Sequence, residues 1–279
     1  MTYRSIIVHV DDQPRCAARV DAALRMAAMF DARIVGIYLK PGLALSPFTA
    51  AMLPSDFVEE RMRQQLDAQQ AAEASFFETA AAANVAAVEW RAPAGDAHEM
   101  MAVHARYADI AVLGQPEAKA DDHAFTNDLA HAVLMDSGRP VLFVPYAGTV
   151  AHVARMVLIA WKNTRESARA IGDAMPLLVQ AREVSAVSVD ASEDVSLADA
   201  AAAQDFDAYL AQHGVAARLR RVVAPDADAG EFLLSHAADA GADLIVMGGY
   251  SHRRIRELVI GGATRTMLRT MSVPVLMSH

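Results

Sequence analysis

The sequence contains two copies of one unit, in the same order along the chain. The segment Ser5–Asp11 resembles Met156–Lys162 at an offset of 151 residues. Further along the unit, Ala108–Gly114 resembles Ala242–Gly248 at an offset of 134 residues. An internal repeat of this length predicts two similarly folded units, each built from the same succession of strands and helices.

The change of offset within the unit shows where the two copies differ in length. Between the first and second matches, the offset falls from 151 to 134, which places about 17 extra residues in the first copy. Three prolines mark this insertion and predict an irregular or short-helical segment over residues 41–56 that flanks or covers the strand ends of the first domain. We expect the two domains to span residues 1–147 and 153–279.

Each copy alternates short β-branched runs with alanine-rich runs that have apolar residues at helical spacing. Residues 6–10 and 244–247 are examples of the first kind, and residues 15–30 and 59–83 of the second. Parallel strands need helical crossovers, and strands that are apolar on both faces need helices on both sides of the sheet. We therefore predict an α/β fold of two tandem doubly wound domains, each a five-stranded parallel sheet flanked by helices. Such sheets bind ligands beyond the carboxyl ends of their strands.

Composition narrows the class of protein further. Hydrophobic residues make up 54% of the chain and charged residues 21%, which excludes global disorder. The net charge of −9 argues against nucleic acid as a general partner. The single cysteine, Cys16, cannot form an intramolecular disulfide, as expected in a reducing compartment. The N-terminal apolar run is too short for a signal peptide, and no run reaches the roughly 18 residues that would span a membrane, so we expect a cytoplasmic protein without a membrane partner.

The sharpest motif follows the fourth strand of the second copy. Gly248 and Gly249 end this strand, and Gly261 and Gly262 precede a helix that we expect to begin near Ala263. Glycines let backbone N–H groups approach a ligand, and a helix N-terminus attracts negative charge. This pattern indicates an anion site, most obviously for phosphate. The alternative is that the glycines only form tight turns.

The glycine spacing and the repeat together resemble the universal stress protein (UspA) family. Nucleotide-binding members carry Gly-x-x-Gly, nine residues and Gly-(Ser/Thr) after the fourth strand. In this frame Ser251 replaces a glycine and Gly262 replaces the hydroxyl residue. The resemblance covers both copies and implies a tandem member with a Rossmann-like, adenine nucleotide alpha hydrolase-like fold. It also implies ATP, with Mg²⁺, or AMP as the ligand.

The resemblance implies unequal sites in the two copies. In members that bind ATP, an acidic residue at the end of the first strand helps to hold the adenosine end. Copy one has this residue, Asp11, but its loop after Gly114 is degenerate, with four acids against one lysine. Copy two has Lys162 instead, followed later by a nearly complete glycine-rich loop of net charge +2. We therefore place any nucleotide in copy two. The residues that we predict to bind it are Ala160, Lys162, Val189, Gly248, Ser251, Arg253, Gly261, Gly262 and Ala263.

Three kinds of function compete. The leading hypothesis is a non-catalytic stress-response protein with ATP or AMP binding in the second domain. The alternative is an interaction-only stress protein in which both nucleotide sites are lost, with a protein partner that the sequence does not identify. A nucleotide-hydrolysing enzyme ranks third, because no paired carboxylates or metal-ligand spacing accompany the loop. His104 and His236 occupy matching places in the two copies, where we expect a structural role.

The final strand of each copy bears on assembly. Residues 140–144 and 274–277 are apolar and would form exposed sheet edges if they were unpaired, which natural sheets avoid. Single-domain relatives commonly pair through these strands, and a covalent linker favours pairing within one chain. We predict an intramolecular pseudo-dimer with the two final strands in or beside its interface. The sequence leaves open whether two chains associate further as a homodimer.

Overall fold

The computed structural model describes residues 2–39, 54–116, 123–148, 150–190, 192–224, 228–250 and 262–279. The first repeat contains β1 (Ser5–Val10), α1 (Cys16–Phe30), β2 (Arg33–Tyr38), α3 (Ser55–Ala82), β3 (Val88–Arg91), α4 (Ala97–Ala105), β4 (Ile110–Gly114), α5 (His123–Asp136) and β5 (Val141–Val144). The second contains β6 (Met156–Ala160), α6 (Arg165–Leu178), β7 (Glu183–Asp190), α7 (Leu197–Gln212), β8 (Leu219–Val223), α8 (Ala229–Asp239), β9 (Leu244–Gly248), α9 (Gly262–Thr270) and β10 (Val275–Ser278).

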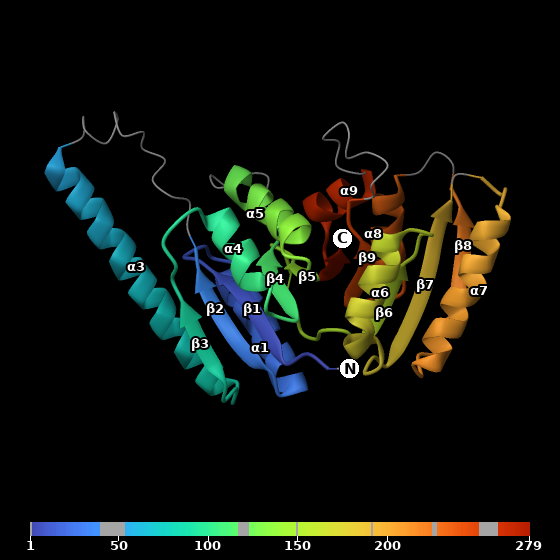
Figure 1. The fold of residues 1–279 in the computed structure, drawn as a ribbon, viewed down its shortest axis with the longest axis horizontal. Helices are drawn as coiled ribbons and strands as arrows, with labels where there is room; N and C mark the ends of the chain where they lie inside the picture. Colours follow the sequence, from blue (N-terminus) through green and yellow to red (C-terminus); the bar gives the residue numbers. More distant parts are fainter. Residues whose placement is uncertain are drawn as a thin grey trace.

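The strands form one ten-stranded sheet in the order β3-β2-β1-β4-β5-β10-β9-β6-β7-β8. Each half is parallel throughout, and the two halves join where β5 and β10 pair antiparallel, with Leu142 opposite Leu276. The second half of the strand order therefore mirrors the first, and the repeats lie side by side without interleaving (Figure 1). The prediction that the two final strands meet within one chain is confirmed.

Helices cover both faces of the sheet, as the doubly wound prediction requires. One buried cluster combines side chains of α1, α3, α6 and α7 with the sheet, and the other combines those of α4, α5, α8 and α9. Both clusters extend through the two repeats, so the β5–β10 junction lies inside a continuous core. In the described parts of the chain, no helix has both the length and the hydrophobicity to cross a bilayer.

The helix α3 begins earlier than the sequence predicts. Its first residue is Ser55 rather than Glu59, so the last two residues of the segment predicted to be irregular or short-helical, Ser55 and Asp56, are helical. Pro54 precedes the helix in an extended conformation, and Asp56 places a negative charge in the first turn, where the helix dipole favours it. The rest of the predicted irregular segment, residues 41–53, lies outside the described residues.

Candidate functional site

The strand order fixes where each half of the sheet offers a ligand site. The chain reverses direction across the sheet between β1 and β4 in the first repeat, and between β6 and β9 in the second. At such a switch point the loops that leave two neighbouring strands diverge to opposite faces and leave a crevice at the carboxyl ends. The sites to inspect are therefore the ends of β1 and β4, and those of β6 and β9.

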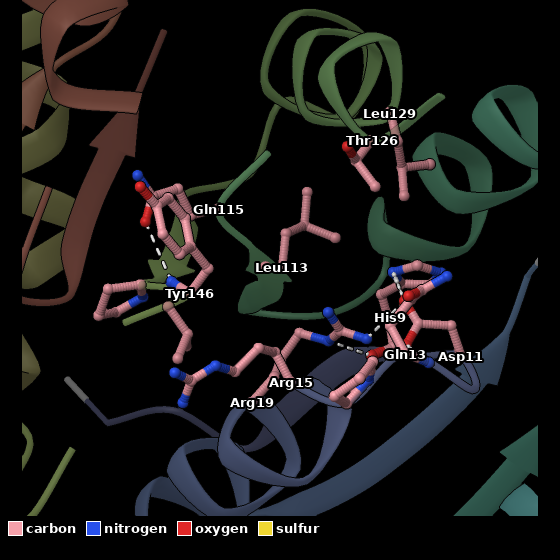
Figure 2. A pocket seen from close by; sticks show the side chains of 14 residues that line it. His9, Asp11, Gln13, Arg15, Arg19, Leu113, Gln115, Thr126, Leu129 and Tyr146 are labelled. Atoms are coloured by element: carbon pink, nitrogen blue, oxygen red, sulfur yellow. Dashed lines mark hydrogen bonds and ion pairs between the residues drawn. The ribbon is translucent and has the colours of Figure 1, made fainter. Parts of the chain in front are cut away.

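A cavity of about 180 Å³ lies at the switch point of the first repeat (Figure 2). Its walls come from the ends of β1 and β4, the start of α1, the helix α5 and the residues that follow β5. Leu113, Thr126 and Tyr146 line it, together with the polar groups His9 and Asp11. His9, Asp11 and Gln13 lie together on one side of the cavity, near the end of β1, whereas Gln115 lies on the opposite side.

A buried ion pair forms the polar side of this cavity. The Arg19 guanidinium lies 2.9 Å from Asp11, through Nη2 and Oδ2, and its Nε donates a hydrogen bond of 2.6 Å to the carbonyl of His9. The backbone N–H of Gln13 donates to the other carboxylate oxygen of Asp11 at 3.1 Å. Arg19 is 5% exposed and Asp11 9% exposed, so little solvent screens the pair. The acid that the family resemblance assigns to the adenosine end is thus held by a side chain of the same repeat.

The ion pair controls the charge of its neighbours. Burial lowers the pKa of His9 to about 4, and Arg19 acts in the same direction, so the ring is neutral at physiological pH. The ring Nε2 lies 3.0 Å from the carbonyl oxygen of Leu39, to which the neutral ring can donate a hydrogen bond. Burial opposes the ionisation of Asp11, but Arg19 outweighs it and holds the pKa of Asp11 below its usual value.

Gly114, at the end of β4, makes room for the guanidinium. A Cβ atom built on Gly114 would lie 2.5 Å from Nη1 of Arg19, closer than any real contact. Glycine at this strand end therefore serves packing of the chain's own arginine. Sequence reasoning missed Arg19, because an arginine in an alanine-rich helix is normally solvent-exposed. The signal that could have found it is the repeat itself, which aligns Arg19 with Ala170.

In the second repeat, different residues stand at these places. Ala160, Lys162 and Ala170 correspond to His9, Asp11 and Arg19. Ala170 is fully buried in α6, whereas Lys162 is exposed just beyond the end of β6, with its backbone N–H donating to Ser167 Oγ at 3.2 Å. The aligned positions of the second repeat therefore hold no counterpart of the Arg19–Asp11 pair.

The structure describes six of the nine predicted nucleotide-binding residues, and they lie along one edge of the second repeat. Ala160, Val189 and Gly248 are at or near the carboxyl ends of β6, β7 and β9, which are neighbours in the order β9-β6-β7. Gly262 and Ala263 begin α9, and Lys162 follows β6. Ser251, Arg253 and Gly261 lie outside the described residues.

Local packing explains part of the glycine pattern. A Cβ atom on Gly248 would lie 2.6 Å from the backbone nitrogen of Ser167, because the first turn of α6 rests on the end of β9. Around the Cβ position of Gly262, in contrast, no described residue lies within 4 Å. The backbone N–H of Tyr250 donates to Thr264 Oγ1 at 3.3 Å, which holds the end of β9 against α9. Packing therefore explains Gly248, whereas no contact among the described residues explains Gly262.

Among the residues that the structure describes, no group of three histidine, cysteine, aspartate or glutamate side chains could hold a metal ion. The two aligned histidines have local structural contacts. His104 Nδ1 accepts from Arg91 Nη1 at 3.0 Å, and the His236 ring stacks on Phe232 with 6.0 Å between ring centroids.

Comparisons with known proteins give the family. The model of the Universal stress protein family matches residues 2–145 and 155–279, one match for each repeat. The solved structure of a universal stress protein from Archaeoglobus fulgidus DSM 4304 superposes with a TM-score of 0.74 at 14% identity, covering 99% of this chain and 96% of that one. A putative universal stress protein from Pseudomonas aeruginosa UCBPP-PA14 gives a TM-score of 0.59 at 16% identity, covering 99% and 93%.

A curated relative agrees over a shorter stretch. The universal stress protein Slr1230 of Synechocystis is 46% identical over 46 residues, which is 16% of this chain and 16% of that protein. The solved structures share the fold, and the family model covers nearly the whole length of both repeats. The chain belongs to the universal stress protein family, with two family units in tandem.

Proposed function

We propose that this protein is a non-catalytic stress-response protein of the cytoplasm that binds an adenine nucleotide, ATP with Mg²⁺ or AMP, at the switch point of its second repeat. The observation that carries the proposal is the contrast at the aligned strand ends. In repeat one the Arg19 guanidinium already pairs with Asp11, whereas repeat two has Ala170 at the arginine's position.

The charges of the second site suit phosphate. Lys162 is exposed at the end of β6, and no described residue lies within 4 Å of the Cβ position of Gly262 at the start of α9. In repeat one the residue aligned with Gly262 is Asp128, an exposed acid in α5. At these aligned positions a phosphate group would meet a lysine and a glycine in repeat two, but two carboxylates, those of Asp11 and Asp128, in repeat one.

The absence of catalysis is part of the proposal. Hydrolysis of a nucleotide needs a positioned base, and usually a metal site. The described residues of the second switch point include one buried acid, Glu166, and its carboxylate accepts a hydrogen bond of 2.8 Å from Arg165. Binding would act by shifting the population of conformations that the protein offers to its partners.

Isothermal titration calorimetry of the intact chain with MgATP, and separately with AMP, tests the proposal. We expect saturable binding of one nucleotide per chain, with no conversion of ATP to ADP or AMP by chromatography after prolonged incubation. Gly262→Asp should weaken binding about tenfold or more, since it brings a carboxylate to the phosphate side without a clash. Ala201→Asp, which adds the same charge on an exposed position of α7, is the matched control and should bind normally.

Each outcome decides the assignment. No heat with either nucleotide would overturn the proposal in favour of an interaction-only protein. Undiminished affinity in a folded Gly262→Asp variant would move the ligand away from repeat two. Steady production of ADP or AMP, proportional to protein concentration, would show that the protein is an enzyme.

A further inference from the structure

The helix α3 is much longer than its counterpart in the second repeat. It has 28 residues, whereas α7 has 16. The two helices bury equivalent pairs near their C-termini, Phe76 with Ala80 in α3 and Phe206 with Leu210 in α7. Aligned on these pairs, the extra turns of α3 are its N-terminal ones, from Ser55 to about residue 66. Much of the insertion in repeat one is therefore additional helix.

These additional turns extend past the edge of the sheet. Figure 1 shows α3 beside the edge strand β3, with its N-terminal half continuing beyond the other elements. Every residue from 61 to 67 is exposed, and the helix has no fully buried residue before Phe76. An unsupported helix of three turns is only marginally stable in water, because tertiary packing normally supplies most of its stability.

An apolar stripe continues along this overhanging part. Val58 and Met62 precede Phe76 and Ala80 by 18 residues, which is five full turns, so all four lie on one face of the helix. Phe76 and Ala80 use this face to pack against the repeat, with Phe76 beside Trp90 at 5.6 Å between ring centroids. Met62 is 59% exposed and Leu66, one turn further along, is 56% exposed. Beyond the sheet, the same face is largely exposed at Met62 and Leu66, and none of the described residues covers it.

The charges beside the stripe are complementary to themselves under a two-fold rotation. Glu59 and Arg63 flank the stripe on the same side, one turn apart and on either side of Met62. When two such helices lie antiparallel with Met62 facing Met62, Val58 of one faces Leu66 of the other. Residues on the same flank then face each other, as in antiparallel helix pairs. Glu59 of each chain would lie beside Arg63 of its partner.

We infer that the overhanging turns of α3, residues 55–67, form an interface with a second copy of this chain, as an antiparallel helix pair centred on Met62. The stripe supplies the apolar contact, and two Glu59–Arg63 pairs between chains supply the orientation. An interface of about three turns is small, so the dissociation constant is expected to be on the order of 10 μM. This association uses the outer end of repeat one and is independent of nucleotide.

Sedimentation velocity of the full-length protein from about 1 to 200 μM tests the inference. The wild-type chain should pass from monomer to dimer in this range, and Met62→Glu should remain monomeric. Leu197→Glu is the matched control, because Leu197 is 91% exposed on α7, the counterpart helix, and this variant should dimerise like the wild type. Thermal melting by circular dichroism confirms that each variant is folded, since all these positions are exposed.

A charge exchange separates an interface from a structural effect within one helix. Glu59→Arg and Arg63→Glu should each weaken dimerisation, because positions 59 and 63 then carry the same charge at both symmetry-related contacts between the two chains. Mixing the two variants should restore association as a heterodimer, since each like-charged helix then meets its opposite. The intrahelical environment of each chain is unchanged by mixing, so only contact between chains predicts this recovery. A wild-type monomer at 200 μM, a dimer that survives Met62→Glu, a Leu197→Glu variant that fails to dimerise, or a mixture that stays monomeric would each overturn the inference.

Discussion

The two repeats place different side chains at the same strand ends. In repeat one, Arg19 reaches from α1 and forms a buried ion pair with Asp11, while in repeat two the aligned residues are the buried Ala170 and the exposed Lys162. The surrounding fold is the same, with mirrored strand order and helices on both faces. The difference shows that two copies of one sheet can have the same strand order while only the first copy has a buried ion pair at these aligned positions.

The charged residues at the ends of β1 and β6 also differ in how much their removal should change stability. A buried ion pair contributes little net stability relative to apolar packing, because both charges lose their hydration. Removing only one partner is costly, since the other charge is left buried and uncompensated. Repeat two has no such sensitivity at the aligned positions, because Lys162 lies in solvent and Ala170 carries no charge that needs a partner. Substitutions at aligned positions should therefore have very unequal effects.

The largest expected effect is the loss of the carboxylate in repeat one. Asp11→Ala should lower the free energy of unfolding by about 3–5 kcal/mol, because the Arg19 guanidinium would remain buried without its counterion. Lys162→Ala, at the aligned position, should change it by less than about 0.5 kcal/mol. Urea unfolding followed by circular dichroism and tryptophan fluorescence measures both.

The double variant Asp11→Ala/Arg19→Ala checks the cause. It should be more stable than the sum of the two single variants predicts, by about 1–3 kcal/mol, because it removes both charges together. Strict additivity, or a cost for Asp11→Ala as small as that for Lys162→Ala, would show that the two strand ends are energetically alike.

The next effect is a pH dependence that repeat one has and repeat two lacks. The pKa of His9 is lowered to about 4 in the folded protein, against about 6.5 in the unfolded chain, whereas Ala160 at the aligned position does not titrate. Below pH 6.5 the unfolded chain binds a proton at His9 that the folded protein excludes. Stability is therefore lost as the pH falls from about 6.5 to about 4, and the loss amounts to about 2 kcal/mol between pH 7 and pH 5.

Urea midpoints at pH 7 and pH 5 measure this loss, and His9→Gln supplies the comparison. Glutamine keeps a hydrogen-bond donor near the Leu39 carbonyl but does not titrate, so this variant should lose about 2 kcal/mol less on acidification. Because all other histidines remain, the difference between the two proteins isolates His9. Equal losses in both proteins would mean that His9 is protonated in the fold.

The sequence predicts the architecture well because the repeat constrains it at many positions at once. The two matched segments that contain β1 and β4, and the apolar final strands, are sufficient for two parallel units and for the β5–β10 junction. The site is less predictable. The family resemblance identifies Asp11, but its partner Arg19 lies a full helical turn inside α1, where an arginine is normally exposed.

The glycines illustrate a second limit. Gly114 and Gly248 both end a fourth strand, and the sequence predicts that Gly248 faces a ligand. Their packing reasons differ, since one accommodates an arginine side chain and the other the backbone of α6. A pattern of small residues reports that something approaches closely, but it does not distinguish a ligand from the protein itself. The start of α3 was missed for a similar reason, because proline marks the boundary of a helix only to within a turn.

The smallest expected effect concerns a matched pair of helix caps. Asp96 accepts from the backbone N–H groups of His98 and Glu99 at the start of α4, and Asp228 does the same for Gly230 and Glu231 at the start of α8. Replacing either cap with alanine should cost about 1 kcal/mol. Asp228 also accepts a hydrogen bond of 3.0 Å from Thr266 of α9, whereas the residue aligned with Thr266 in repeat one is Ala132.

Asp228→Ala should therefore be more destabilising than Asp96→Ala, by about 1 kcal/mol, the contribution of one additional hydrogen bond. Thr266→Ala removes that bond alone, and in its background the two cap substitutions should cost the same in urea unfolding. The double-mutant cycle between Asp228 and Thr266 measures the coupling between α8 and α9 directly. A coupling energy near zero would mean that this hydrogen bond adds nothing to the cap, and that the two repeats hold their fourth helices equally firmly. A coupling of the expected size would show that repeat two fixes α9, the helix beside the proposed nucleotide site, through a contact that repeat one does not have.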